Sequence, residues 1–477
     1  MLLGLLLLPI YAQDSRLDQA RALVQQGRAE EALPILLDLH RSDQSNANLC
    51  QQIGIAYTQL QDLTQAERFY RQAVRLNPQF WAARKNLGTV LWFLDRKGES
   101  EREFHAVVKV LPADPVPHLY LGLAAHARGE FQVAKLQFEK AGSLAAENME
   151  VLPAVLESYL ATGDMSFPDR VIRRLNGDSN PDPTLALRAI ALLLHYGHAA
   201  RAESLCEKLV LLHENSADLT RMLAEAYNRQ GRPEQAYRAY AQSIEADPSI
   251  EDTYIDFAEF ASTHGNNDYA LQIISQGLER VPQSPGLLFE RGILLALKGD
   301  RDQAESNFAQ ARGLKPDWAL PLLALGVSQL EAGEVAKAVK SFRNARAVDP
   351  NDFRAHYLYA TALARENDSD QNRAEAVAAL RKAVEINPHD ARSHAQLGQL
   401  QLAAGKPEAA AIEWQATLKI EPENTTALYQ LGLLYRKQGK TEAAERLLQT
   451  FQSVKAKKHR EEESLVQLLR MGPEKAR

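Results

Sequence analysis

The sequence predicts an all-α fold, a solenoid of antiparallel helix hairpins, and three observations support this prediction. Small residues, alanine and proline recur at fixed places with a period of 34 residues. Between these places, apolar residues follow the i, i+3, i+4, i+7 spacing of amphipathic helices. A hairpin of this size cannot bury its apolar stripes by itself, so each hairpin must pack against its neighbours.

Residues 319–350 show the pattern of a single hairpin most clearly. Apolar residues recur at helical spacing in the first half, and Gly333 then provides a residue that can turn at positive φ without steric cost. The second half has its own apolar stripe, which includes Ala338 and Phe342. Pro350 ends it, because proline lacks an N–H donor and its ring clashes with the preceding turn.

The same places recur in about thirteen units along the chain when Ala319 is counted as the first place of its unit. Gly326 then marks the eighth place, where residues are mostly small, and Pro350 marks the thirty-second. Small residues at the eighth and twentieth places let the two helices of a hairpin approach closely. Larger side chains near the twenty-fourth place are expected to fill the space toward the next hairpin. Alanine occupies the twentieth place in eleven of the thirteen units, at Ala32, Ala66, Ala134, Ala202, Ala236, Ala270, Ala304, Ala338, Ala376, Ala410 and Ala444.

This pattern resembles the tetratricopeptide repeat family, and the resemblance covers roughly residues 13–451. The family's tryptophan at the fourth place is absent, and residues such as His118, Tyr254 and His356 stand there instead and can still pack. The resemblance implies a right-handed superhelix of about thirteen hairpins that ends in a C-terminal capping helix. It implies no particular activity, because a repeat architecture hosts many unrelated functions.

The chain begins with an apolar run over residues 1–12, which is followed by polar residues and resembles a secretory signal peptide cleaved after Ala12. No basic residue precedes the run, and Ile10 is large for its place two residues before the cut. An apolar helix that caps the first hairpin is therefore the alternative. The first interpretation predicts a periplasmic or secreted protein, and the second a cytoplasmic one.

The repeats are expected to form two sub-arrays, with four hairpins over residues 13–146 and eight over residues 183–451. Residues 147–182 contain a degenerate fifth hairpin and a seam, and we expect residues 163–183 to form the flexible joint, because repeats contact only their neighbours. A proline inside a helix costs about 3 kcal/mol, so Pro168 is expected to begin a shortened helix. Residues 452–477 are expected to form a capping helix and tail, and a basic docking site at their start is the alternative.

The composition argues against several classes of protein. The 55 basic and 61 acidic side chains give a net charge of −6, whereas a dedicated nucleic-acid binder normally has a basic face. No apolar run reaches the eighteen or so residues that a membrane-spanning helix requires. Cys50 and Cys206 are four hairpins apart, too far for a disulfide, which tolerates only about 7 Å between Cα atoms. Both are expected to be buried packing residues.

The sequence contains no recognisable catalytic or metal-binding motif, so we expect neither an enzyme nor a cofactor. The nearest match is Gly439-Lys440-Thr441, which resembles the end of a phosphate-binding loop. Leu434 stands where that loop requires a glycine, so a hairpin turn is the better interpretation. The histidines occur singly within helices, and the repeats leave no room for a catalytic domain.

What the hairpins provide is a surface. In proteins of this family the first helices of successive units line a concave groove, mainly through the second, fifth, ninth, twelfth and thirteenth places. Trp, Tyr and Arg at such places are frequent energetic anchors of interfaces, whereas Leu119, Leu323 and Val327 could equally pack against the adjacent first helix. Carried over residue by residue, the resemblance predicts a partner-binding groove that includes Lys85, Thr89, Trp92, Phe93, Leu119, Leu123, His126, Arg221, Arg229, Phe289, Leu323, Val327, Arg354 and Tyr357.

These features predict a non-catalytic scaffold that holds an extended peptide or a partner protein along the groove. One alternative is a scaffold in cell-surface polysaccharide export or assembly, with groove aromatics against sugar rings. Another is a regulatory or substrate-recruiting subunit of a separately encoded enzyme. Of the carboxylate clamp found in chaperone-tail binders of the family, only Lys85 and Asn86 have counterparts here.

Overall fold

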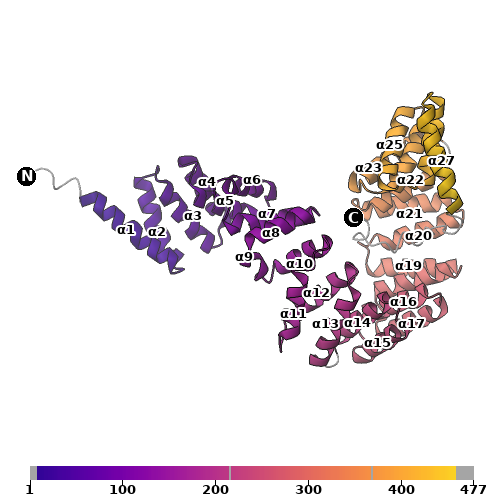
Figure 1. Cartoon of the computed structure of the whole chain (residues 1–477), viewed down its shortest axis with the longest axis horizontal. Helices are drawn as coiled ribbons and strands as arrows, with labels where there is room; N and C mark the ends of the chain where they lie inside the picture. The colour runs from indigo at the N-terminus through magenta and orange to yellow at the C-terminus, as the bar shows by residue number, and fades with distance from the viewer. Residues whose placement is uncertain (1–7, 214–215, 367–368, 458–477) are drawn as a thin grey trace, which may run out of the picture. The chain divides into compact units, whose positions relative to one another are not determined.

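The computed structural model describes residues 8–457 apart from residues 214–215 and 367–368. In these ranges the protein forms 27 α-helices and no strand, which confirms the all-α solenoid of helix hairpins. The chain divides into two compact units, Met1–Ala236 and Tyr237–Arg477, called here the N-terminal and C-terminal units. Figure 1 shows the helices of each unit following one another in chain order.

Helices α1 to α14 belong to the N-terminal unit, and α16 to α27 belong to the C-terminal unit. The first set is α1 (Leu8–Gln25), α2 (Ala29–Ser42), α3 (Ala47–Gln59), α4 (Leu63–Leu76), α5 (Trp81–Phe93), α6 (Lys97–Val108), α7 (Pro115–Ala127), α8 (Phe131–Ala141), α9 (Ser143–Ala146), α10 (Leu152–Ala161), α11 (Pro168–Gly177), α12 (Pro183–His195), α13 (Ala199–Leu212) and α14 (Ala217–Arg229). The unit boundary falls within α15 (Pro233–Ala246). The second set is α16 (Glu251–Thr263), α17 (Asn267–Arg280), α18 (Pro285–Leu297), α19 (Arg301–Leu314), α20 (Leu320–Glu331), α21 (Val335–Val348), α22 (Phe353–Glu366), α23 (Asp370–Ile386), α24 (Ala391–Ala403), α25 (Pro407–Ile420), α26 (Thr425–Lys437) and α27 (Thr441–Lys457).

Within each unit, helices pack in the order in which they occur. First helices contact the second helix of their own hairpin, as in α3 with α4 and α20 with α21. Each second helix also contacts the next hairpin, as in α4 with α5 and α21 with α22. First helices of neighbouring hairpins touch one another too, as in α5 with α7 and α18 with α20. Successive first helices therefore share one face of each unit.

The tenth hairpin, α20 and α21, confirms the predicted turn and stop. Gly333 has a φ of 78°, and Glu334 N donates to Gln329 O at 2.8 Å across the turn. Helix α21 ends at Val348, two residues before Pro350. Positive φ costs glycine little because it has no Cβ, which explains why glycine occupies this turn.

Glycine at the eighth place makes room for a ring at the twenty-fourth place of the same hairpin. A Cβ on Gly326 would lie 2.5 Å from Cε1 of Phe342, closer than real Cβ contacts allow. Gly398 stands in the same relation to Trp414, with a Cβ-to-Nε1 distance of 2.5 Å. The expected packing toward the next hairpin also occurs, because Phe104 stacks on Tyr120 of α7 with ring centroids 5.1 Å apart. The contact within the hairpin was not foreseen.

Several fourth-place residues tie each hairpin to the loop before it. His118 Nε2 lies 2.8 Å from the carbonyl oxygen of Pro112, and His356 Nε2 lies 2.9 Å from that of Pro350. Tyr254 OH donates to the carbonyl oxygen of the corresponding proline, Pro248, at 3.1 Å. Because proline ends the preceding helix and leaves its carbonyl unpaired, a polar ring at the fourth place satisfies it. His118 and His356, which the sequence shows singly within helices, thus each have a structural partner.

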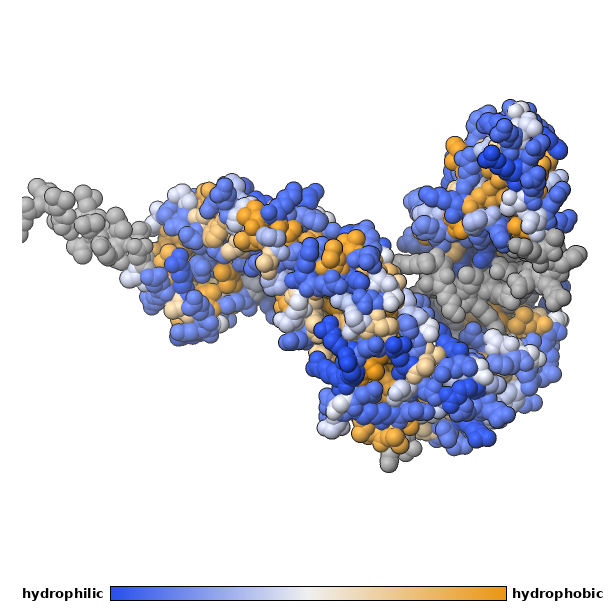
Figure 2. Space-filling model, in the orientation of Figure 1, coloured by the Kyte–Doolittle hydropathy of each residue, from blue (hydrophilic) through white to orange (hydrophobic). Residues whose placement is uncertain are grey.

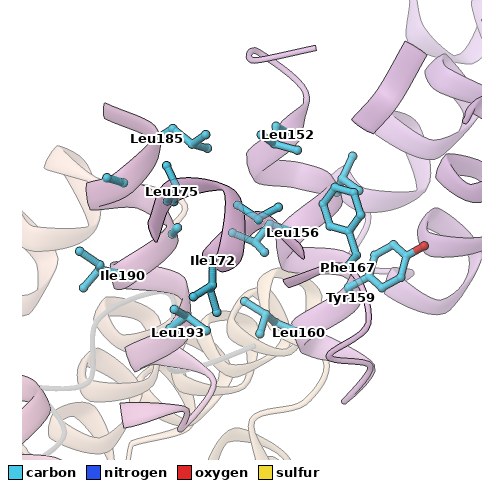
Figure 3. Close-up of a cluster of buried hydrophobic side chains, with 14 of the residues drawn as sticks. Leu152, Leu156, Tyr159, Leu160, Phe167, Ile172, Leu175, Leu185, Ile190 and Leu193 are labelled. Atoms are coloured by element: carbon cyan, nitrogen blue, oxygen red, sulfur yellow. The ribbon is translucent and has the colours of Figure 1, made fainter. Parts of the chain in front are cut away.

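The fifth hairpin is shortened in the way its prolines predict. Pro168 is the first residue of α11, a helix of only 10 residues, which confirms its predicted role as a helix start. A buried apolar cluster runs without interruption from Leu119 through this hairpin to Ala226. Figure 3 shows its central part, where Leu156 and Ile172 project from neighbouring helices into the same core. The flexibility of the seam stays a prediction.

Both predicted terminal segments reach beyond the described residues. Residues 1–7 lie outside them, while α1 begins at Leu8 and continues past the predicted cleavage point after Ala12. At the other end, α27 completes the thirteenth hairpin, and residues 458–477, most of the predicted capping helix, lie outside the described part. Among the helices that the structure describes, none combines the length and apolar character needed to cross a membrane.

Candidate partner-binding surface

The predicted groove residues of the N-terminal unit lie mainly on two neighbouring first helices, α5 and α7. Lys85 joins these helices, because its Nζ lies 2.7 Å from Oδ2 of Asp114, which caps the start of α7. Thr89 donates its hydroxyl to Lys85 O at 3.2 Å, and Leu119 is buried between the helices. Leu123 is half-buried at the same face. Leu119 is therefore a packing residue, whereas Leu123 retains exposed surface.

An aromatic cluster at the C-terminal end of α5 is the most exposed apolar part of this face. Phe93 is 64% exposed, and its ring meets that of Tyr120 edge-on at 6.5 Å. The half-buried Trp92 ring lies 5.3 Å from the same tyrosine, and Lys97 Nζ lies 3.9 Å from the centre of the Trp92 ring. Burial raises the pKa of the Tyr120 hydroxyl, and its hydrogen bond with Thr89 opposes part of that rise. The rings are thus held in place while one of them faces solvent.

A polar network continues this face across the fifth hairpin. His126 Nε2 at the end of α7 lies 2.9 Å from Oε2 of Glu157 on α10, and Tyr196 OH donates to Glu157 Oε1 at 3.3 Å. The bond with His126 lowers the pKa of Glu157, against the opposing effect of burial. Burial and the nearby carboxylate raise the pKa of Tyr196 to about 12. The network links three first helices, because Tyr196 directly follows α12.

Sequence reasoning missed three members of this surface, Tyr120, Glu157 and Tyr196. Glu157 stands at the ninth place of the fifth hairpin, so the rule that selected Thr89 would have found it had the hairpin not been set aside as degenerate. Tyr120 stands at the sixth place and Tyr196 at the fourteenth, outside the groove places. Only their contacts identify them, because the first-helix ends lie close together in space.

The two predicted arginines on α14 have their charges engaged locally. Arg221 Nη2 lies 3.6 Å from Asp218 Oδ1, and Arg229 Nε lies 2.5 Å from Glu225 Oε1. Arg229 also donates Nη1 to the carbonyl oxygen of Leu194 at the end of α12. Arg229 therefore joins α14 to the neighbouring first helix α12, whereas the Arg221–Asp218 pair lies within α14.

In the C-terminal unit, several predicted groove residues belong to the core instead. Leu323 is 0% exposed and Val327 1% exposed, so both pack inside the unit, which was the second of the two alternatives for them. Phe289 is half-buried, with its ring 5.8 Å from Phe308 and 4.9 Å from Trp318. Leu323 and Val327 therefore present no side-chain surface to a partner in this structure.

The predicted basic–aromatic pair of α22 is also partly internal. Arg354 is buried, and its guanidinium contacts the equally buried Asp352 with Nη2 2.8 Å from Oδ2. Tyr357 is half-buried, and burial raises the pKa of its hydroxyl. An arginine held this way acts in the folding of its own hairpin, because separating a buried pair leaves a costly unpaired charge. Arg354 is thus a poor candidate for partner contact, while Tyr357 remains accessible.

A shallow depression opens between the third and fourth hairpins. It has a volume of about 530 Å³ and is lined by Lys85, by the loop residues 110–114, and by Pro115 and Val116. Val110 and Leu111 on its wall are exposed. This depression lies at the start of α7, at the opposite end of the first helices from Phe93.

Both cysteines are buried and free, as the sequence predicts. Burial raises the pKa of Cys50 to about 11 and that of Cys206 to about 12, so neither thiol is activated. In the residues that the structure describes, no group of three or more His, Cys, Asp or Glu is arranged to hold a metal ion.

Comparison with known families gives matches along much of the chain. Three family models, each described as a tetratricopeptide repeat, match this sequence. The first matches residues 323–391, 369–421 and 395–452, the second residues 47–80, and the third residues 13–37 and 217–242.

Two human proteins are similar in sequence. Tetratricopeptide repeat protein 21A is 22% identical over 312 residues, which cover 59% of this chain and 24% of that protein. Tetratricopeptide repeat protein 6 is 25% identical over 162 residues, which cover 33% of this chain and 31% of that protein. The chain thus spans about a quarter to a third of the length of these curated relatives.

Two solved structures are similar in outline. The crystal structure of yeast Tom70 is 13% identical, with a TM-score of 0.49 over 93% of this chain and 99% of that chain. A crystal structure of MamA is 24% identical, with a TM-score of 0.32 over 35% of this chain and 95% of that chain.

Proposed function

Because the chain belongs to the tetratricopeptide repeat family, we propose that it is a non-catalytic scaffold that binds an extended segment of a partner protein across its first helices. Repeats of this kind support protein–protein interaction. The segment would lie on the face shared by successive first helices of one unit.

The aromatic cluster of Trp92, Phe93 and Tyr120 is the observation that carries this proposal. The rings of Phe342 and Trp414, at the twenty-fourth place of their hairpins, are fully buried, whereas Phe93, at the thirteenth place of its hairpin, is 64% exposed. Burying a side chain of this size contributes about 1.5–3 kcal/mol, so leaving the ring in solvent forfeits stability that a partner can recover. Because tilted and edge-on contacts with Tyr120 already hold the Trp92 and Phe93 rings, little rotamer entropy would be lost on binding.

Half-buried residues beside the cluster extend it into a track. Leu123 follows on α7, and the His126–Glu157 pair crosses to α10. A track with an apolar end and a hydrogen-bonding end suits an extended peptide, whose backbone needs polar partners while its side chains need apolar ones. In the C-terminal unit, exposed Leu402 and Tyr429 on α24 and α26 and half-buried Tyr357 on α22 offer a second such face.

We place the scaffold in the cell envelope or outside the cell, on the resemblance of residues 1–12 to a signal peptide. Expression of the whole chain in its host, followed by N-terminal sequencing of the accumulated protein, tests this. A mature chain that begins at Gln13 supports the location, and a chain that retains Met1 contradicts it.

The partner-binding proposal is tested by affinity capture from the native host, with the whole chain as bait beside two variants. The groove variant is Trp92→Ala/Phe93→Ala/Leu123→Ala. The control variant, Val133→Ala/Leu136→Ala, removes two exposed apolar side chains from the second helix α8. Circular dichroism first establishes that all three baits have the same helix content.

A protein captured by the whole chain and by the control variant, but lost with the groove variant, supports the proposal once its binding is reproduced with purified components. Equal capture by all three baits would mean that binding uses second helices or loops, and would overturn the assignment to the first helices.

A further inference from the structure

Two successive hairpin turns of the N-terminal unit combine exposed apolar side chains with acidic ones. Leu60 directly follows α3 and is 37% exposed, and Phe93 ends the neighbouring first helix α5. Asp62 and Asp95 each follow two residues after these apolar residues and are also exposed. Figure 2 shows hydrophobic surface over the part of the unit that contains α5 to α8. Leu60, Gln61, Asp62, Phe93 and Asp95 are together called here the turn rim.

Among the hairpin turns within the described residues, these two depart from a backbone rule that ten others follow. Gln61 has a φ of 60° and Asp95 a φ of 58°, although neither is glycine. The corresponding turn position is a positive-φ glycine in ten hairpins: Gly27, Gly129, Gly163, Gly197, Gly231, Gly265, Gly299, Gly333, Gly405 and Gly439. A side chain at positive φ is strained, and such strain is retained mainly where the side chain has another use. Here the two exceptions occur in adjacent hairpins, beside exposed apolar residues.

The charges at the turn rim favour a basic ligand. Asp95 has a side chain that is 91% exposed, with Lys97 Nζ at 3.6 Å, and that ammonium also donates to Trp92 O at 3.1 Å. Asp62 accepts from the backbone N–H of Gln65 at 3.0 Å and otherwise faces solvent. The turn rim thus has the two carboxylates of Asp62 and Asp95 beside the single ammonium group of Lys97.

A neighbouring network of four charged residues is balanced within itself. Arg71 and Arg96 form a closed set with Glu67 and Glu99, with all four N–O distances between 2.6 and 2.8 Å. This set adds no net charge to the rim. The local excess is therefore negative and comes from Asp62 and Asp95.

We infer that the turn rim is a docking surface for a partner segment in which apolar residues alternate with Lys or Arg. The apolar residues would cover Leu60 and Phe93, and the basic ones would reach Asp62 and Asp95. This inference rests on the proposed function and specifies its ligand at one end of the track. Neighbouring helices pack about 8–10 Å apart, a distance that an extended peptide spans in about three residues, so one short segment reaches both turns.

The choice of a basic segment is argued from the carboxylates. An acidic segment would meet like charges at both turns, and the same repulsion disfavours an anionic lipid surface. A purely apolar segment would leave the carboxylates near its own apolar atoms without a partner, which costs desolvation energy. Complementary charge lowers that cost and also aligns the segment along the two turns.

The test uses fluorescence anisotropy with the whole chain and three labelled twelve-residue peptides. The first alternates Leu or Phe with Lys or Arg, the second has Glu at every basic position, and the third has Ser at every apolar position. Saturable binding of the first, with a dissociation constant below about 1 mM and at least about tenfold weaker binding of the other two, is the expected result. Absence of binding by the first peptide, or equal binding of the acidic one, overturns the inference.

Variants of the chain then place the binding on the rim. Phe93→Ala should weaken binding of the first peptide by about tenfold and Asp95→Asn by about fivefold, with the latter loss disappearing at high salt. Ile412→Ala is the matched control, because Ile412 is also 64% exposed but lies on α25. Unchanged affinity in both rim variants would overturn the inference.

The double variant Gln61→Gly/Asp95→Gly separates binding from folding. Relief of the two positive-φ positions should raise the melting temperature by about 2 °C, while peptide affinity falls by about fivefold. A variant that is both more stable and equally able to bind would show that these side chains have no part in docking.

Failure of this inference is distinguishable from failure of the proposed function. If the native partner is lost with the groove variant but the rim variants retain it, the scaffold function stands and only the basic–apolar ligand is wrong.

Discussion

The tenth and sixth hairpins fill the space between their two helices with different pairs of side chains. In the tenth, Gly326 on α20 faces the ring of Phe342 on α21, which is fully buried. In the sixth, the eighth place holds Ile190 and the twenty-fourth holds Cys206, and both are fully buried too. One helix gives up a side chain so that the other can carry a ring, or both carry a medium-sized one. The fold requires that the space be filled, but not from which side.

The fifth hairpin belongs with the sixth. Leu156 takes the eighth place and Ile172 the twenty-fourth, and both lie in the continuous core shown in Figure 3. The absence of glycine from the eighth place therefore does not prevent the two helices of this hairpin from forming a packed core. It marks a repeat whose core is built from aliphatic side chains, with the shortening at α11 due to Pro168.

The largest loss of stability is expected when an aromatic ring is removed from a hairpin that has glycine at the eighth place, such as the tenth. Phe342→Ala should lower the free energy of unfolding by about 4 kcal/mol, because Gly326 opposite has no side chain to fill the cavity. Cys206→Ala, in the aliphatic type, should cost about 1 kcal/mol. Urea unfolding followed by circular dichroism measures both, and hydrogen exchange localises the loss to α20 and α21. An equal loss of unfolding free energy in the two variants would contradict the proposed difference between the two kinds of hairpin.

A side chain added opposite the ring should be nearly as costly. Gly326→Leu places atoms where Phe342 already lies, and we expect a loss of about 3 kcal/mol from overpacking. The pair Gly326→Leu/Phe342→Ile imitates the fifth hairpin and should recover most of that loss. The control is Gly313→Ala on α19, where no atom lies within 4 Å of the new Cβ. This change should stabilise the helix by about 0.5–1 kcal/mol. A double variant no better than the single one would contradict the exchange of volume.

The predicted seam gives a smaller effect. If residues 163–183 form a flexible joint, limited trypsin digestion should cut there at least about tenfold faster than in the tenth hairpin, which corresponds to about 1.4 kcal/mol less protection. Arg170, Arg173 and Arg174 provide the cleavage sites. Mass spectrometry of the first fragments identifies the cut. Cleavage scattered evenly along the chain would mean that the continuous core makes this hairpin as rigid as the others.

The smallest effect is a pair of opposed pH dependences at the fourth place. The hydrogen bond with Glu413 raises the pKa of His394, whereas burial lowers the pKa of His356. His394 therefore adds stability that is full below the ordinary histidine pKa of about 6.5 and is lost as the pH rises through its folded value. His356 prefers its neutral form, so its contribution is present above about pH 6.5 and is lost as the pH falls.

Urea unfolding of His394→Gln and His356→Gln at pH 5, 6.5 and 8 tests these signs. The wild type should exceed His394→Gln by more at pH 5 than at pH 8, and should exceed His356→Gln by more at pH 8 than at pH 5. The same trend in both variants would show that one of the two assignments is wrong.

Much of the fold follows from places that repeat in the sequence. The turn at Gly333, the stop before Pro350 and the helix start at Pro168 each depend on the backbone chemistry of one residue, so they can be read locally. The all-α solenoid follows because the same spacing recurs for thirteen units. What the repeat pattern did not show is which first-helix residues remain at the surface.

Tertiary structure determined which of the predicted groove residues are exposed at the partner-binding surface. The sequence by itself determined the period, the hairpins and the face of each first helix, because these depend on residues close together in the chain. It assigned both Leu323, at the fifth place, and Phe93, at the thirteenth, to the groove, yet the first is buried and the second is 64% exposed. Burial depends on the side chains that neighbouring hairpins bring to the same spot. The rings around Tyr120 and the Glu157 network exist only through such contacts between hairpins, which no single repeat contains.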